Sequence, residues 1–397
     1  MSAPKPGPGT PTRAIVFLAF AGFASQAMVR VADPLLPQIA ADIGTTVGTA
    51  SIVTSAYAVS HGLTQLFGSP IGDRFPKFIL VALLCGLCGV ATLACGFSRT
   101  LPELGIARLA CGLTAGMIIP LAMAFIGDTV PYEDRQPVLG RFLAGQISGL
   151  VGGQVIGGVV GDYFGWRNVF VFVAGLFALA LVLLVFELLS NPMTRRAPQR
   201  LEQRLGFAGE YAAVFGNPWA RIVVLAVFLE AAIMFSAFAY IGADLHTRMG
   251  LSFSAVGAVL AAFGIGGLTY VLTVGQLVNR LGQVGLVITG GTMLTLSFLA
   301  LALAPVWWLS FAAIAVIGLA FYMVHNTLQV NATQMAPRAR ATAIGIFSSA
   351  LYVGQGAGVA AAAPIFDRFG AVPLFLIAAL VWPLLCWWFS AKLRKRT

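Results

Sequence analysis

Four charged residues lie within long apolar stretches of this sequence: Arg30, Asp33, Arg108 and Glu230. A charge at the centre of a bilayer costs at least about 2.5–3.5 kcal/mol on insertion scales, so such residues usually serve a function. Arg30 and Asp33 share one helix face, because they are three residues apart. Positive neighbours favour an ionised carboxylate, whereas burial favours its protonated form. We therefore expect Asp33 to bind and release a proton under the control of Arg30 and Arg108, with a permanent structural ion pair as the alternative.

Glu230 has no basic residue nearby on its own apolar stretch. An acid at this depth usually faces a cavity. The sequence therefore predicts that Glu230 binds a cationic compound or carries a second proton. The alternative is a neutral carboxylic acid packed between helices.

Polar residues within the apolar stretches are candidates for hydrogen bonding to a small bound molecule: His61, Gln65, Tyr57, Gln146, His325, Asn326, Gln329 and Gln355. His325 and Gln329 are four residues apart, as are His61 and Gln65, so each pair lies on one helix face. Asn326 and Gln329 are three apart and extend the same stripe. The histidines are also candidates for a proton relay. Hydrogen bonding between helices is the alternative.

The elements that position these residues follow from composition. Of the residues, 59% are hydrophobic and 10% are charged, with a mean hydropathy of +0.90. Soluble domains carry about 25% charged residues, and a helix of about 20 apolar residues crosses a bilayer. The sequence predicts an all-α membrane protein with twelve transmembrane helices, over residues 14–39, 48–70, 78–97, 101–126, 138–160, 167–190, 220–244, 252–275, 284–303, 306–331, 340–363 and 371–390.

Basic residues predict the orientation. With both termini inside, 18 of the 24 lysines and arginines fall in cytoplasmic segments and 4 fall outside, as the positive-inside rule requires. Residues 1–13 are then a disordered cytoplasmic tail and residues 391–397 a basic one. The span that follows the first tail lacks a cleavage site and is expected to remain as a helix. A cytoplasmic linker, 191–219, separates six-helix bundles at 14–190 and 220–390.

The sequence offers little for other chemistry. The net charge of +10 is explained by the cytoplasmic loops, and no nucleic-acid partner is expected. Cys85 and Cys88 form a lone CxxC inside an apolar stretch, which favours packing over a metal or redox site. No catalytic triad, metal cluster or phosphate-binding loop is present in the sequence. We expect no enzymatic activity, metal or cofactor.

Two motifs recur at a nearly constant offset. Ser69-Pro-Ile-Gly-Asp73-Arg74-Phe-Pro76-Lys77 is echoed by Gly275-Gln-Leu-Val-Asn279-Arg280-Leu-Gly282-Gln283, and Asp162-Tyr-Phe164-Gly165 by Asp367-Arg-Phe369-Gly370. An even number of spans in each half makes this a parallel repeat. In such proteins the central site lies between the halves, near the bilayer midplane.

These motifs resemble those of the major facilitator superfamily. The loop Ser69–Lys77 is similar to that family's G-x-L-a-D-R-x-G-R-K signature, and Arg108–Gly116 to its R-x-x-x-G-x-x-x-G motif. The stretch Gly149–Gly158 resembles the antiporter motif G-x-x-x-G-P-x-x-G-G, with Gln154 in place of proline. The segment 30–40, the His325 stretch and Glu230 resemble the bacterial drug and arabinose efflux branch.

The resemblance implies specific roles. Asp73 and Arg74 would form a gate with the start of the eleventh span and with Asp128, and Arg280 would mark a weaker gate in the second half. The glycines of the fifth span are expected to pack helices first and to act as a hinge second: Gly149, Gly153, Gly157 and Gly158.

The resemblance also implies a function. It is proton-coupled efflux of a small amphipathic or cationic compound by alternating access, driven by the proton gradient, from a monomer in the bacterial inner membrane. A sugar or organic-anion transporter of the same fold and a non-transporting membrane sensor remain alternatives. A membrane enzyme is disfavoured, because acids and histidines do not cluster at one interface.

Overall fold

The computed structural model describes residues 11–67, 75–195 and 207–396, and this part of the chain is helical and contains no β-strand. Ten helical segments within it are long and apolar enough to cross a membrane. One of them, Phe253–Leu303, holds two spans, because the chain breaks at Gly282. The shorter helix Ile52–Gln65 adds another. The total of twelve confirms the predicted all-α fold.

The first half of the chain begins with an interrupted span. Its elements are α1 (Thr12–Arg30), the 3-10 turn η1 (Asp33–Leu35), α2 (Leu36–Ile43), α3 (Val47–Ala50), α4 (Ile52–Gln65), α6 (Lys77–Phe97), α7 (Leu101–Ala115), α8 (Ile118–Thr129), α9 (Tyr132–Phe164) and α10 (Trp166–Ser190). The sequence predicted one continuous helix over 14–39, whereas the structure breaks it between Arg30 and Leu36. Pro34 and Pro37 account for the break, since proline lacks the N–H that a helix interior requires.

The second half begins with two short elements that connect it to the first half. Its elements are η2 (Pro192–Arg195), α11 (Phe207–Gly216), α12 (Pro218–Thr247), α13 (Phe253–Leu303), α14 (Trp307–Gln334), η3 (Pro337–Ala339), α15 (Arg340–Phe369) and α16 (Val372–Arg394). Gly282 lies within α13 at φ +61°, a conformation that only glycine adopts readily, and it separates the eighth span from the ninth. The last helix extends to Arg394, beyond the predicted boundary at residue 390.

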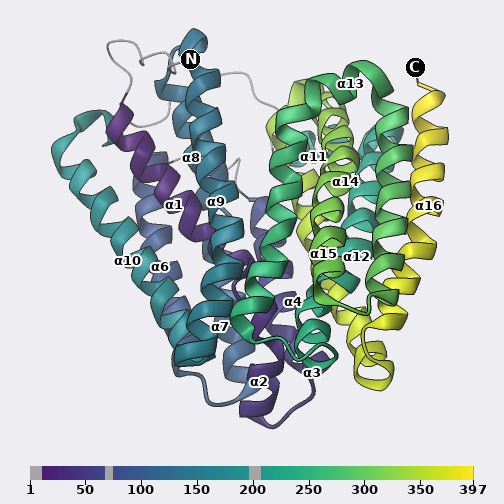
Figure 1. Ribbon diagram of the computed structural model, residues 1–397. Helices are drawn as coiled ribbons and strands as arrows, with labels where there is room; N and C mark the ends of the chain where they lie inside the picture. The colour runs from purple at the N-terminus through teal and green to yellow at the C-terminus, as the bar shows by residue number, and fades with distance from the viewer. Residues whose placement is uncertain (1–10, 68–74, 196–206, 397) are drawn as a thin grey trace.

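The helices form two bundles that stand side by side (Figure 1). One hydrophobic core takes its buried residues from between Ala14 and Leu184, and another takes them from between Val214 and Leu393. Each half therefore buries its own apolar surface. The start of α1 and the end of α16 lie at the same end of the molecule, called the terminal end below, and the other end is the opposite end (Figure 1).

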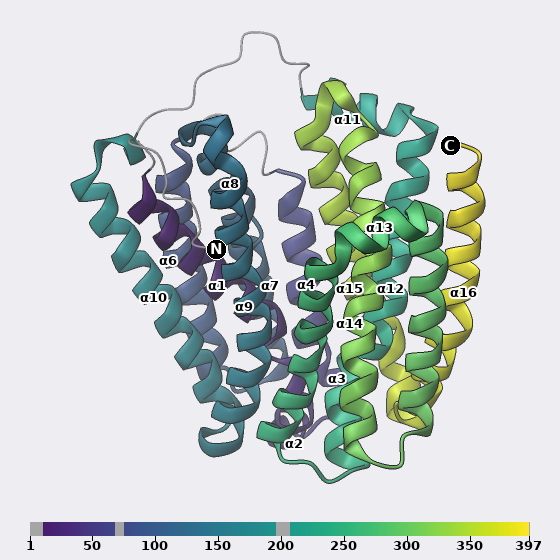
Figure 2. The same ribbon diagram turned by 45° about the horizontal axis from the view of Figure 1, so that its top comes forward.

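Two helix pairs join the bundles. Helix α4 lies against α15 (Figure 2). Because Gly62 of α4 has no side chain, its backbone lies close to Tyr352 of α15. Helix α9 meets α13 where Gly158 faces Gly257, and a methyl group added to Gly158 would lie 3.0 Å from the Gly257 Cα atom. Toward the terminal end the ribbons of α9 and α13 diverge (Figure 1). The two bundles are thus joined most tightly near the opposite end.

Within each bundle, glycines four residues apart let two helix backbones approach. Gly149, Gly153 and Gly157 of α9 face Phe23, Ala27 and Val31 of α1. Small residues at such spacing allow close packing of helices in lipid. The second bundle repeats this contact at an offset of 205 residues, where Gly354 and Gly358 of α15 face Phe228 and Ala232 of α12. Gly158, in contrast, faces the other bundle.

Replacing Gly153 with leucine should destabilise the protein. A β-carbon there would lie 2.8 Å from the Ala27 Cα atom, so α1 and α9 would have to separate. Overpacking of this kind costs about 1–3 kcal/mol or more. The measurement is the thermal unfolding midpoint of purified protein in detergent. Gly175→Leu is the matched control, because Gly175 has open space around it; equal midpoints for the two variants would contradict the packing role.

Candidate functional site

A cavity of about 160 Å³ lies between the two bundles. It is lined by Gln26, Val29, Arg30, Leu143, Gln146, Ile147, Leu150, Phe235, Phe263, Phe321, Tyr322, His325, Leu351, Tyr352 and Gln355. These residues come from α1 and α9 of the first bundle and from α12, α13, α14 and α15 of the second. The cavity therefore lies between the two halves, as expected for a parallel repeat.

The Arg30–Asp33 ion pair lies at the break in the first span. The Nη1 atom of Arg30 is 3.2 Å from the Oδ2 atom of Asp33, and both side chains are buried. The Arg30 guanidinium also stacks over the Phe235 ring, 4.1 Å from its centroid, and near Phe238 at 5.5 Å. The Oδ1 atom of Asp33 is buried and has no hydrogen-bond partner in the structure. Asp33 therefore keeps one oxygen on which a proton could reside.

Arg108 lies apart from this pair and is fully buried. Its Nε atom donates to the Val53 carbonyl at 2.8 Å and its Nη1 atom to the Met28 carbonyl at 3.4 Å. Its guanidinium stacks over the Tyr57 ring at 4.3 Å. The structure thus brings Arg30, and not Arg108, into direct contact with Asp33. The Nη2 atom of Arg108 is buried without a partner, as is Asp33 Oδ1.

Glu230 and His325 form a second pair, between α12 and α14. The Glu230 Oε2 atom is 2.9 Å from the His325 Nδ1 atom. Glu230 is fully buried, and its Oε1 atom has no partner. His325 lines the cavity and its ring stacks on Phe321 at 5.2 Å. Glu230 itself is not part of the cavity wall, because His325 lies between it and the open space.

The other polar candidates divide into those that line the cavity and those that join helices. Gln146 and Gln355 line the cavity. Asn326 donates to the Tyr270 hydroxyl at 2.7 Å and so joins α14 to α13, whereas Gln329 is exposed.

His61 and Gln65 do not line the cavity. Gln65 donates to the Gly116 carbonyl at 2.6 Å and lies near His61. The His61 ring packs between Tyr57 and Tyr352, with its centroid 4.1 Å from that of Tyr352. This group therefore belongs to the contact between α4, α7 and α15.

Several wall residues were not among the candidates chosen from the sequence: Gln26, Phe235, Phe263, Phe321, Tyr322 and Tyr352. Aromatic residues are common along apolar spans, so nothing in their spacing marked them as cavity residues. Gln26 carried a usable signal, because it is an amide in an apolar span four residues before Arg30.

Two carboxylates connect the bundles at the opposite end. Asp162, near the end of α9, accepts a hydrogen bond from the backbone N–H of Ser254 at 3.2 Å, at the start of α13. Asp367, near the end of α15, accepts one from the N–H of Gly48 at 2.7 Å, at the start of α3, and another from the Thr46 hydroxyl at 2.6 Å. A carboxylate is stabilised at a helix N-terminus by the free N–H groups and the helix dipole. These are called the two aspartate latches below.

The predicted gate at the terminal end is only partly described. Asp73 and Arg74 lie outside the described residues. Asp128 pairs with Lys77, with 2.6 Å between Nζ and Oδ2, and Arg280 is exposed. The pair joins α6 to α8 within the first bundle.

Helix α11 contacts both bundles at the terminal end. Tyr211 donates to the Leu66 carbonyl of the first bundle at 2.5 Å. Its neighbour Glu210 accepts a hydrogen bond from Thr342 at the start of α15. The connecting helix therefore lies against the helix pair α4 and α15.

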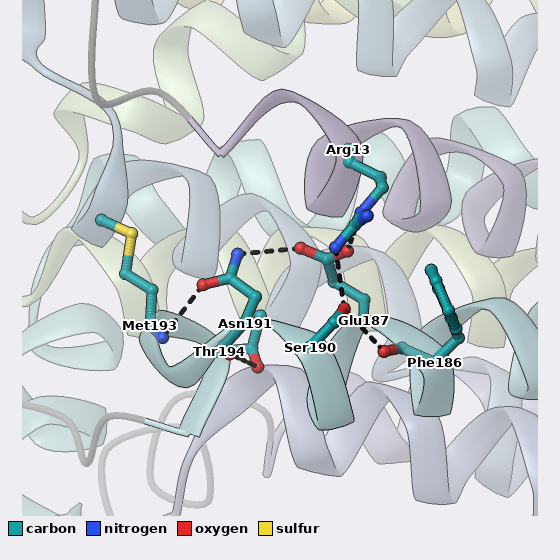
Figure 3. Close-up of polar contacts among 7 residues, drawn as sticks. All are labelled: Arg13, Phe186, Glu187, Ser190, Asn191, Met193 and Thr194. Atoms are coloured by element: carbon teal, nitrogen blue, oxygen red, sulfur yellow. Dashed lines mark hydrogen bonds and ion pairs between the residues drawn. The ribbon is translucent and has the colours of Figure 1, made fainter.

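A buried acid outside the cavity also has a clear partner. Glu187, near the end of α10, pairs with Arg13 near the start of α1 and accepts a hydrogen bond from Asn191 (Figure 3). Arg13 also donates to Ser190 at 2.7 Å. This cluster joins the first and last spans of one bundle, so its role is structural.

The cysteines serve packing. All five are buried free thiols. Cys85 and Cys88 do not form a site; instead the sulfur atoms of Cys95 and Cys111 lie 3.8 Å apart between α6 and α7. Within the described residues, no group of three or more potential ligands could hold a metal ion.

A bilobed helical bundle with a central cavity is the architecture of a membrane transporter, and sequence comparison identifies the family. A model of the Major Facilitator Superfamily matches residues 18–359, and the chain belongs to that superfamily. It is a transporter of that family and not an enzyme.

Relatives cover nearly the whole chain at low identity. The uncharacterised MFS-type transporter YceJ of Bacillus subtilis is 26% identical over 92% of this chain and 93% of its own. A probable sugar efflux transporter of Mannheimia succiniciproducens is 23% identical over 96% of this chain and 94% of its own. Among solved structures, the nucleoside transporter NupG has a TM-score of 0.75 at 15% identity, covering 95% of this chain and 98% of that one; it supports the fold alone.

Proposed function

We propose that this chain exports a small amphipathic compound across a bacterial inner membrane in exchange for protons. The main support is the buried Arg30–Asp33 pair at the break in the first span, in which Asp33 Oδ1 has no partner. A carboxylate held by one arginine in an apolar interior changes its proton affinity when that arginine moves. The similarity to a probable sugar efflux transporter of Mannheimia succiniciproducens agrees with export.

Alternating access would expose the cavity to each side in turn. With the orientation that the positive-inside rule favours, the terminal end faces the cytoplasm and the two aspartate latches face outward. The diverging α9 and α13 then correspond to a conformation that opens toward the cytoplasm. We further propose that the protein works as a monomer, since each bundle supplies part of the cavity wall.

The proposed coupling uses Asp33 as the proton carrier. In this conformation Arg30 is paired with Asp33 and supplies its counter-charge. A movement that separates the pair leaves a buried carboxylate, which then takes up a proton. The Glu230–His325 pair is a second proton site in this proposal, because the Oε1 atom of Glu230 is buried without a partner beside the His325 ring.

The gate at the terminal end is proposed from the resemblance. Asp73 and Arg74 would hold the start of α15 when that end closes. The Lys77–Asp128 pair would fix the loop that carries them. Arg280 is the counterpart in the second bundle.

The test of this proposal is transport in proteoliposomes with and without a pH gradient. Purified protein is reconstituted, and a set of candidate compounds, including sugars, amphipathic cations and neutral drugs, is screened for uptake. We expect the gradient to raise accumulation of the transported compound about tenfold per pH unit, if one proton exchanges for one neutral molecule. Equal transport of every carried compound with and without the gradient would overturn proton coupling.

A further inference from the structure

The charges near the cavity are compensated within the protein. Arg30 is paired with Asp33 and covered by the Phe235 ring. Glu230 is paired with His325 and fully buried. A ligand charge would therefore find no free counter-charge among the described wall residues.

A cationic compound is particularly disfavoured. The two acids at this depth, Asp33 and Glu230, are both fully buried and lie behind Arg30 and His325, which face the cavity. Moving an ion out of water costs several kcal/mol unless it gains a partner. The sequence had suggested Glu230 as a binding site for a cation. Because Glu230 is paired with His325 and does not line the cavity, it is not available as a counter-charge for a cationic ligand. An anion would have to compete with Asp33 for Arg30.

Neutral hydrogen-bonding groups do line the cavity: the carboxamides of Gln26, Gln146 and Gln355 and the phenols of Tyr322 and Tyr352. A carboxamide both donates and accepts, so it matches hydroxyl, carbonyl and amide groups of a neutral ligand. Gln355 is only 2% exposed, and its Nε2 atom has no hydrogen-bond partner. A buried donor without a partner is destabilising, and an acceptor on a ligand would remove that cost.

Aromatic rings supply the rest of the wall. Phe321 lies close to Phe235, Phe263 and Tyr322, with ring centroids 5.7–6.0 Å apart. Such rings favour offset-stacked or edge-on contact with another ring. The cavity of about 160 Å³ is smaller than the roughly 300–1,000 Å³ typical of pockets for drug-sized ligands. Its dimensions suit a compound of about one ring.

From this arrangement we infer that the transported compound is a small, neutral, ring-shaped solute, held by carboxamide hydrogen bonds and aromatic contacts. The inference deepens the proposed function and rests on the central cavity being the transport site. The protein would then select its substrate by the hydrogen-bonding groups of the compound and not by its charge. Gln355 is the residue expected to determine specificity most strongly.

The experiment compares binding of compounds that share a ring and differ in charge. One set is benzamide, benzoate and benzylamine; the other is methyl glucoside, glucuronate and glucosamine. Thermal unfolding of the purified full chain at increasing ligand concentration gives each dissociation constant. We expect the neutral member of at least one set to bind tightest, and Gln355→Leu to weaken it about tenfold, the value of one hydrogen bond.

Controls separate binding from folding. Gln136→Leu is the matched control, because Gln136 is exposed on α9 and does not line the cavity; it should leave the dissociation constant unchanged. Gln146→Leu provides a second cavity variant if Gln355→Leu fails to fold. Tightest binding by a charged member, no binding by either neutral member, or equal loss in the control would overturn the inference.

The binding experiment tests the substrate class separately from proton coupling. Neutral compounds that bind through Gln355 but show no response to a pH gradient would overturn proton coupling and leave the substrate class standing. If the compound whose transport responds to the pH gradient is charged, the substrate class is overturned and proton coupling stands.

Discussion

Replacing Asp33 with asparagine should abolish substrate-driven proton movement in reconstituted vesicles. Asparagine keeps the size of aspartate but cannot exchange a proton, so the exchange step loses its carrier. Removing a proton-transfer group typically lowers rates by about 10²–10⁴-fold. The measurement is the pH change inside vesicles that contain a fluorescent pH indicator, recorded when the transported compound is added. Exchange of labelled for unlabelled compound without a gradient should continue.

Two further variants make this result interpretable. Asp33→Asn leaves Arg30 as a buried charge without its partner, which is strongly destabilising in other proteins. The double variant Arg30→Gln with Asp33→Asn removes both charges and should fold while remaining uncoupled. Glu230→Gln tests the second acid. Proton movement that persists in Asp33→Asn but disappears in Glu230→Gln would move the carrier role to Glu230.

Removing both aspartate latches should shift the protein toward a form that opens at the opposite end. In Asp162→Ala with Asp367→Ala, the N–H groups of Ser254 and Gly48 lose their carboxylate partners across the bundle interface. A side-chain cap contributes about 1 kcal/mol, and a charge at a helix N-terminus about 0.3–1 kcal/mol or more. Together the two latches supply roughly 3 kcal/mol, or about a hundredfold change in the ratio of the two forms.

Spin labels report this shift directly. Cysteines introduced at Phe97 and Leu303 lie on exposed positions at the opposite end, one in each bundle. The five native cysteines are buried, so labelling should favour the new sites. Pulsed electron-paramagnetic-resonance distances between the labels should lengthen in the double variant.

A matched control lies at the same end. Asp42 pairs with Arg167, and both residues belong to the first bundle. Asp42→Ala therefore removes an aspartate ion pair without releasing a contact between bundles. If it lengthened the label distance as much as the double latch variant, the latches would not be the cause.

Much of the fold could be predicted from the sequence because lipid imposes a simple rule on helix length. The structure confirms the predicted first residue of the fourth span, Leu101, and that of the eleventh span, Arg340. The break after Arg30 was not predicted, since hydropathy continues unchanged through Pro34 and Pro37. The eighth and ninth spans were predicted as separate helices, and the structure places the break between them at Gly282.

The site was harder to predict than the fold. Charge at membrane depth identified Arg30, Asp33 and Glu230, because each is costly in an apolar stretch. Their partners depend on contacts between helices. Glu230 and His325 are 95 residues apart, and nothing in either segment indicates that they meet. The repeat that links Asp162 to Asp367 was visible in the sequence, but the latches themselves require the packing of α9 on α13 and of α15 on α3.

The two separate hydrophobic cores have a consequence for assembly. Because each bundle buries its own interior, the connection between residues 195 and 207 is needed to keep the halves together more than to fold them. Two polypeptides ending and beginning there, made in the same cell, should each insert and then associate through α4 with α15 and α9 with α13. The matching glycine contacts at an offset of 205 residues also fit descent from a parallel dimer of a single six-helix chain, joined later by gene duplication and fusion.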